Sequence, residues 1–153
     1  MPVGAYGGRT DLMGHIAPEG PVYQAGTLSG HPLTMAAGAA TLAKLSVDRY
    51  ERLESAGAIL QAGVAAAAAE AGRDVAITRV GSLMTVFFRA GTPRNGAEAL
   101  TADRDAYARF FGAMLDAGIL LAPSQFEAWF ISLAHDPATI DATLDAARGA
   151  FRA

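Results

Sequence analysis

The chain has 153 residues, of which 52% are hydrophobic and 18% charged, and its formal net charge is -3. These values are typical of a soluble globular protein, and the acidic balance argues against nucleic-acid binding, which favours a basic surface. The absence of cysteine excludes disulfides and thiolate metal sites. No signal peptide opens the chain, and no apolar run approaches the roughly 20 residues that span a bilayer. We therefore expect a cytoplasmic protein with no membrane partner.

The first thirty residues are rich in glycine and proline and contain only short candidate elements. Short strands are expected at 2–6 and 22–25, with one or two helical turns at 9–16. Nothing nearby offers these strands a partner, and an unpaired strand edge is a liability. The segment is therefore interpreted as part of a larger sheet.

Two helices follow. Pro32 begins an alanine-rich helix that is expected to reach about Leu45, because proline is well tolerated at a first helical position. Ser46 is expected to cap a second helix, which Gly72 ends. Its buried stripe is expected to contain Tyr50, Leu53, Leu60 and Val64. The domain boundary is therefore placed at 45/46, where residues 1–45 belong to something larger and residues 46–153 form a C-terminal part with its leading helix.

The remainder is predicted to be a compact α+β unit. Strands at 75–80 and 83–88 are separated only by Gly81-Ser82, and a glycine-first loop of two residues is typical of a hairpin. A helix at about 102–117 follows, and one of its faces carries Tyr107, Phe110, Phe111, Met114 and Leu115. Short strands at 119–122 and 129–133 come next. Asp136-Pro137 then begins a last helix, with an apolar stripe of Ile140, Leu144, Ala147 and Phe151. We expect a small, mostly antiparallel sheet covered by helices.

The glycine-flanked run from Gly20 to Gly30 has two hydroxyls, Thr27 and Ser29, shortly before the start of a helix. Backbone N–H groups at a helix start and nearby hydroxyls favour an anion, so the run predicts a phosphate contact. A plain capped turn explains the same residues. Glu127, between two aromatic residues in a strand connection, could line a cleft or be an exposed loop carboxylate.

Other catalytic patterns are weak. The three histidines lie far apart and have no ligand spacing, so no metal site is predicted. Lys44 is the only lysine, and its place in an alanine-rich helix indicates a surface residue, whereas a Schiff-base enzyme needs a lysine at its cofactor.

Taken together, several segments resemble glutamate-1-semialdehyde 2,1-aminomutase, a class III aminotransferase. The most specific of them is the run Tyr-Gln-Ala-Gly-Thr-Leu-Ser-Gly at 23–30. The resemblance covers nearly the whole chain and also includes the segments 2–9, 17–18, 108–111, 121–124, 126–128 and 132–135.

The resemblance implies the C-terminal part of a pyridoxal-phosphate enzyme of fold type I (αβα), active as a homodimer. It implies that residues 1–45 are a remnant of the large cofactor-binding domain and that residues 46–153 are the C-terminal small domain with its leading helix. It implies conversion of glutamate 1-semialdehyde to 5-aminolevulinate, the tetrapyrrole precursor, through pyridoxal 5'-phosphate and pyridoxamine 5'-phosphate forms of the cofactor. Gly26 and Thr27 would contact the cofactor phosphate of the opposite subunit. Glu127 would lie near the substrate, in place of an arginine of related transaminases, while Ser29 and Tyr6 would shape the site wall.

The sequence departs from this family at two points. His31 stands where asparagine is usual, and the Schiff-base lysine of the family falls upstream of Met1. The chain is therefore expected to hold no catalytic residue itself, either as a fragment or because its start lies at an internal methionine. Two alternatives stay open: a fragment of another class III aminotransferase, against which the run at 23–30 argues, and a non-catalytic dimerisation or binding module.

Overall fold

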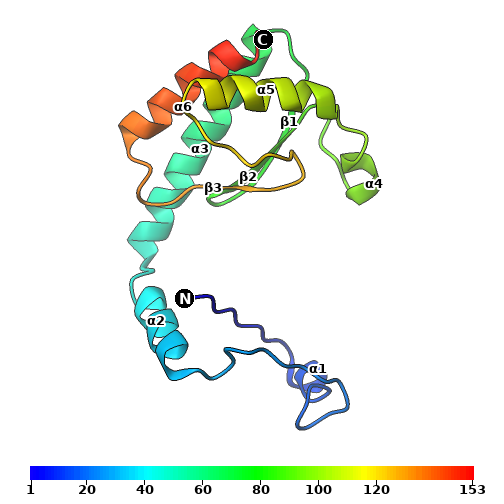
Figure 1. Ribbon diagram of the computed structural model, residues 1–153, viewed down its shortest axis with the longest axis vertical. Helices are drawn as coiled ribbons and strands as arrows, with labels where there is room; N and C mark the ends of the chain where they lie inside the picture. The colour runs from blue at the N-terminus through cyan, green and yellow to red at the C-terminus, as the bar shows by residue number, and fades with distance from the viewer. The chain divides into compact units, whose positions relative to one another are not determined.

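The computed structural model describes residues 1–153 as two compact units, Met1–Ser46 and Val47–Ala153 (Figure 1). The first unit contains two helices, α1 (Thr10–Met13) and α2 (Pro32–Leu42). Pro32 occupies the first turn of α2, as its sequence position predicts.

The strands expected in the first unit do not form. Residues 2–6 have no regular structure, and the segment 22–25 contributes only an isolated parallel bridge between Ile16 and Val22. A strand needs a hydrogen-bonded neighbour, and this unit supplies none for the segment 2–6. The apolar residues of α2 and its end are also largely exposed, namely Leu33, Met35, Leu42 and Leu45.

The second unit is an α+β fold, as predicted. Its elements in chain order are α3 (Val47–Glu70), β1 (Ala76–Val80), β2 (Leu83–Phe87), α4 (Gly96–Ala99), α5 (Arg104–Asp116), β3 (Trp129–Phe130) and α6 (Pro137–Ala150). The strands form one antiparallel sheet in the order β1-β2-β3. No helix of the chain is long and apolar enough to cross a membrane.

The hairpin and the helix ends follow local sequence rules. Val80 pairs with Leu83 across the predicted two-residue loop, and Gly81 has the positive φ of 57° that favours glycine. The carboxylate of Asp136 accepts the Thr139 N–H at 2.8 Å and caps α6 as expected.

Three details of the second unit differ from the predicted elements. A single helical turn, α4, was missed: Asn95 caps it by accepting the Glu98 N–H at 2.9 Å. The segment 119–122 is not a strand, and β3 covers only two of the five residues expected at 129–133. These segments find too few backbone partners at the edge of so small a sheet to extend the ladder.

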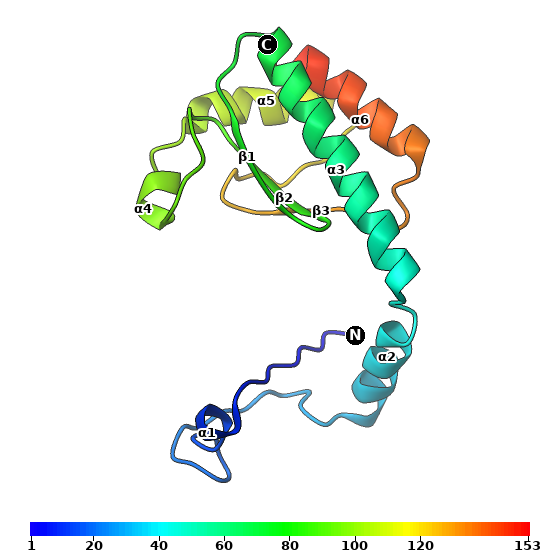
Figure 2. The same ribbon diagram turned by 180° about the vertical axis from the view of Figure 1, so that it is seen from behind.

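The helices bury one face of the sheet. Met84 and Trp129 are cross-strand partners on that face, and both are buried. The apolar stripe predicted for α6 lies wholly in the core. Figures 1 and 2 show α3 alongside α6, with α5 packed against α6. Tyr50, predicted to lie on a buried stripe, and Leu115, predicted to lie on the apolar face of its helix, are about half exposed, at 55% and 46%.

Gly57 sets the approach of α3 to the hairpin. A Cβ at this position would lie 2.5 Å from the backbone oxygen of Gly81. Arg79 ties the same two elements together by donating to Gly81 O at 2.6 Å and to the carboxylate of Glu54 at 2.7 Å. The contact therefore requires a residue without a side chain.

We expect Gly57→Ala to lower the free energy of unfolding by about 1–3 kcal/mol, the usual cost of overpacking. The matched control is Gly112→Ala in α5, where a Cβ meets nothing within 4 Å. That change should stabilise the chain by up to about 1 kcal/mol, since alanine is the better helix former. Urea denaturation measures both, and equal shifts in the two variants would contradict the close contact.

Candidate functional site

Four of the five predicted site residues border one hollow of the first unit. Tyr6, Gly26, Thr27 and Ser29 line a groove of about 660 Å³. The remaining lining residues are Pro2, Val3, Gly4, Ala5, Gln24, Leu28 and Met35. None of the lining side chains is charged, so the groove offers hydrogen bonds but no compensating cation.

The turn that contains Thr27 is held by its own backbone. The Ser29 N–H donates to Gly26 O at 3.0 Å, and the His31 N–H donates to Leu28 O at 3.1 Å. Gly30 has a positive φ of 72°. A Cβ on Gly26 would lie only 2.9 Å from the Ser29 hydroxyl oxygen, so this position also favours glycine.

The turn has groups that could donate hydrogen bonds to a small anion. Gly26, Thr27 and Ser29 are exposed, and neither hydroxyl makes a hydrogen bond within the chain, so both remain able to donate. His31, at the N-cap of α2, makes no side-chain cap hydrogen bond. The helix start therefore lacks the bond to a first-turn N–H that an asparagine could supply there. These donors match the oxygens of a phosphate in type, while its charge needs a partner from outside the groove.

Glu127 lies in the second unit, so the structure does not bring it together with the other four residues. It ends the turn Ser124–Glu127, in which the Glu127 N–H donates to Ser124 O at 3.1 Å. The Ser124 hydroxyl accepts the Phe126 N–H at 3.2 Å within the same turn. The Glu127 side chain is exposed.

The sequence did not point to two residues at this turn, Gln125 within it and Arg104 beside it. The side chain of Gln125 is buried and hydrogen-bonded at both ends of its amide group. The guanidinium carbon of Arg104 lies 5.3 Å from the centre of the Phe126 ring, in the range of a cation–π contact. In the sequence Gln125 is one of several polar residues of the segment 124–127, and nothing placed Arg104 beside Phe126, from which it is 22 positions upstream.

Tyr107 anchors the preceding segment. Its hydroxyl donates to Ala122 O at 2.5 Å. Burial raises the pKa of Tyr107 above that of an ordinary tyrosine, a hydrogen bond with Trp129 opposes this shift, and the negative charge of Glu127 adds to it. The phenol is therefore kept in its neutral, hydrogen-bonding form.

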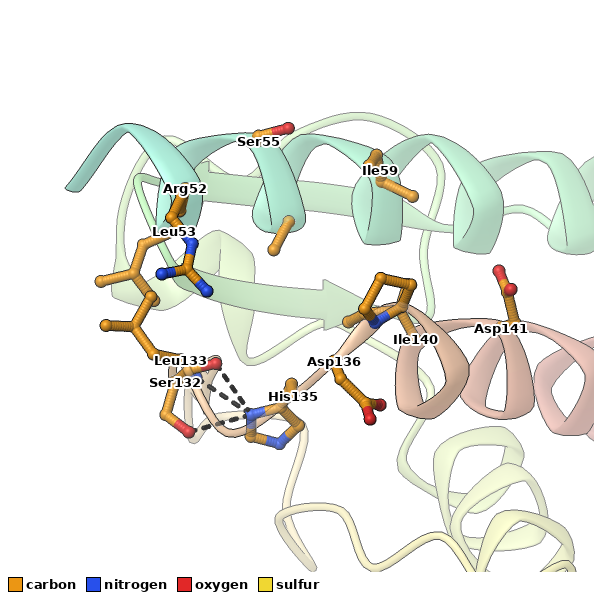
Figure 3. Close-up of a pocket in the computed structure, with 12 residues that line it drawn as sticks. Arg52, Leu53, Ser55, Ile59, Ser132, Leu133, His135, Asp136, Ile140 and Asp141 are labelled. Carbon is orange, nitrogen blue, oxygen red and sulfur yellow. Dashed lines mark hydrogen bonds between the residues drawn. The ribbon is translucent and has the colours of Figure 1, made fainter. Parts of the chain in front are cut away.

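A separate cavity of about 350 Å³ lies between α3 and the start of α6 (Figure 3). Arg52, His135 and Asp141 are among its polar lining groups. The His135 ring accepts a hydrogen bond from the Ser132 N–H at 3.0 Å and lies 3.1 Å from the Ser132 hydroxyl. None of the five predicted site residues lines this cavity.

No protein-family model matches the sequence. The chain is 52% identical over 153 residues to the glutamate-1-semialdehyde 2,1-aminomutase of Desulfatibacillum aliphaticivorans, covering 99% of the chain and 36% of that relative. It is 50% identical over 154 residues to the aminomutase of Pelotomaculum thermopropionicum, covering 100% and 36%. The chain thus spans little more than a third of the length of the curated relatives it matches.

Solved structures show the same relationship. A glutamate-1-semialdehyde aminomutase variant of Pseudomonas aeruginosa in complex with PMP has a TM-score of 0.74 and 30% identity, over 82% of this chain and 28% of that one. A β-phenylalanine aminotransferase from Variovorax paradoxus has a TM-score of 0.78 and 31% identity, over 94% and 33%. The fold is therefore that of a portion of the pyridoxal-phosphate-dependent aminotransferases and aminomutases.

Backbone similarity does not separate the two groups, but sequence identity does, because the curated relatives at about 50% are aminomutases. Over nearly its whole length the chain is similar to a portion of the glutamate-1-semialdehyde 2,1-aminomutases. This confirms the family that its motifs indicate.

The raised pKa of Tyr107 predicts a loss of stability in alkaline solution. The unfolded chain loses the phenol proton near pH 10, below the folded pKa, so the free energy of unfolding should fall as pH rises from about 10. Tyr107→Phe should remove this decline in urea titrations at several pH values. Tyr23→Phe, at a position that is 83% exposed, is the control and should retain it. An equal decline in Tyr107→Phe would contradict the assignment.

Proposed function

We propose that this chain forms part of a pyridoxal-phosphate-dependent isomerase that converts glutamate 1-semialdehyde to 5-aminolevulinate. The observation that carries the proposal is the 52% identity to an aminomutase along 99% of the chain. A fragment of another class III aminotransferase fits the fold equally well but not this identity. Because the chain covers about a third of its relatives, the activity is proposed for a longer protein that contains it.

The groove around Thr27 is proposed to bind the cofactor phosphate. The hydroxyls of Thr27 and Ser29 would donate to phosphate oxygens, and Gly26 lets the anion approach the backbone closely. When bound, the cofactor supplies an electron-withdrawing ring and the amino group that the rearrangement needs. The lining residues include no cation, which supports a site shared with another surface. We assign that surface to the second subunit of a homodimer.

Glu127 is proposed to line the substrate pocket, and Tyr6 to form part of the site wall. Glutamate 1-semialdehyde has an aldehyde where glutamate has its first carboxylate. A carboxylate side chain facing that carbon accepts an uncharged group and repels the carboxylate of an ordinary amino acid. The exposure of Glu127 at the end of an anchored turn is consistent with this role.

A chimaeric aminomutase, in which this chain replaces the matching segment of the Desulfatibacillum aliphaticivorans protein, tests the phosphate assignment. Thr27→Val keeps the shape of the side chain and removes its donor. A hydrogen bond to a charged group contributes about 1.5–3 kcal/mol, so affinity for pyridoxal phosphate should fall roughly 10- to 100-fold. Turnover at saturating cofactor should change much less.

Thr41→Val is the matched control, because the Thr41 hydroxyl donates within α2 to Ala37 O and lies outside the groove. Affinities are measured by equilibrium dialysis with pyridoxal phosphate and with pyridoxal, which lacks the phosphate. Binding of pyridoxal should be unaffected by Thr27→Val. Equal affinity of Thr27→Val and Thr41→Val for the phosphorylated cofactor would refute the phosphate contact.

A further inference from the structure

Gln125 is the most deeply anchored residue of the turn that ends in Glu127. Its side chain is 2% exposed. Its Oε1 accepts the Phe88 N–H at 2.9 Å, and its Nε2 donates to Asp103 O at 3.0 Å. Both polar ends of the amide are satisfied, which a buried glutamine requires.

The two backbone groups that Gln125 joins belong to different elements. Phe88 follows the last residue of β2, and Asp103 is the N-cap of α5. The Asp103 N–H donates to Phe88 O at 2.8 Å. The glutamine amide therefore completes a hydrogen-bonded bridge between a strand end and a helix start, as a neighbouring strand would do in a larger sheet.

The segment on either side of Gln125 is held as well. The Tyr107 hydroxyl fixes Ala122 on the upstream side, and Arg104 lies over the ring of Phe126 on the downstream side. Gln125 and Phe126 are the two central residues of the turn, and Glu127 is its last. These contacts fix the direction in which the chain leaves the turn. None of them involves the side chain of Glu127.

We propose that Gln125 is a positioning residue that holds the Glu127 carboxylate in place for the substrate. The inference rests on the proposed role of Glu127 in the substrate pocket. Glutamine suits the position because its terminal amide provides both a hydrogen-bond donor and an acceptor. Methionine has the same length with neither group, and glutamate would place a carboxylate oxygen against the Asp103 carbonyl.

The test uses Gln125→Met in the chimaeric aminomutase, alone and combined with Glu127→Gln. With Glu127 present, Gln125→Met should lower kcat/KM for glutamate 1-semialdehyde by about 10-fold or more, because small misplacements of an active-site group are costly. With Glu127→Gln already in place, the same change should alter kcat/KM by less than about twofold. A purely structural role would produce the same loss in both backgrounds.

Gln61→Met is the matched control, since Gln61 also accepts a side-chain hydrogen bond in this unit, from Arg79 at 2.8 Å, but lies away from the turn. It should leave kcat/KM within about twofold of the parent. Should Gln125→Met fail to fold, Tyr107→Phe provides the same comparison. It removes the hydrogen bond from the Tyr107 hydroxyl to Ala122 O, upstream of the turn, and keeps the aromatic ring in the core.

If Gln125→Met lowers kcat/KM by the same factor with and without Glu127→Gln, the positioning role is overturned, while the role of Glu127 is left intact. If Glu127→Gln alone leaves kcat/KM unchanged in an active chimaera, the role of Glu127 fails and the positioning role falls with it. Amide hydrogen exchange of residues 124–127 gives a second readout. It should be faster in Gln125→Met than in Gln61→Met, and equal rates would also overturn the proposal.

Discussion

The second unit depends on one residue, Phe88, which serves the core with its ring and the neighbouring turn with its backbone. The ring centre lies 5.3 Å from that of Phe110 and 5.8 Å from that of Phe151, so β2 is joined to α5 and α6 through aromatic contacts. Its N–H and C=O bind Gln125 and Asp103. The packing that stabilises the fold and the hydrogen bonds that hold Gln125 therefore meet at the same position.

The first unit is governed by a different constraint. Its candidate site is a backbone turn beside an open groove without any charged lining residue, and the large apolar residues of α2 are exposed rather than packed. A turn of this kind can recognise the shape and oxygens of an anion, but it cannot neutralise two negative charges. The absence of a charged lining residue agrees with the proposal that this turn is one part of a phosphate site and that a second subunit completes it.

The sequence was informative wherever structure is decided by near neighbours. The hairpin at Gly81, the Asp136 cap and the apolar stripe of α6 follow from local backbone chemistry and helical periodicity, and the structure confirms them. The strands expected at 2–6 and 119–122 failed, because a strand exists only where a second strand supplies hydrogen bonds. Periodicity also misjudged Tyr50 and Leu115, which lie on the apolar stripes of α3 and α5 but are about half exposed.

The residues of the candidate site also differ in whether near neighbours in the sequence decide their structure. Thr27 and Ser29 could be proposed from sequence because their turn is built from consecutive residues. Gln125 could not, because its significance lies in two backbone groups that are 37 and 22 positions away. A buried glutamine that takes the place of a strand neighbour looks, in sequence, like any polar residue in a loop. Motif resemblance therefore identifies candidate ligand-binding residues more readily than the residues that position them. The positioning residues become visible only in the three-dimensional structure.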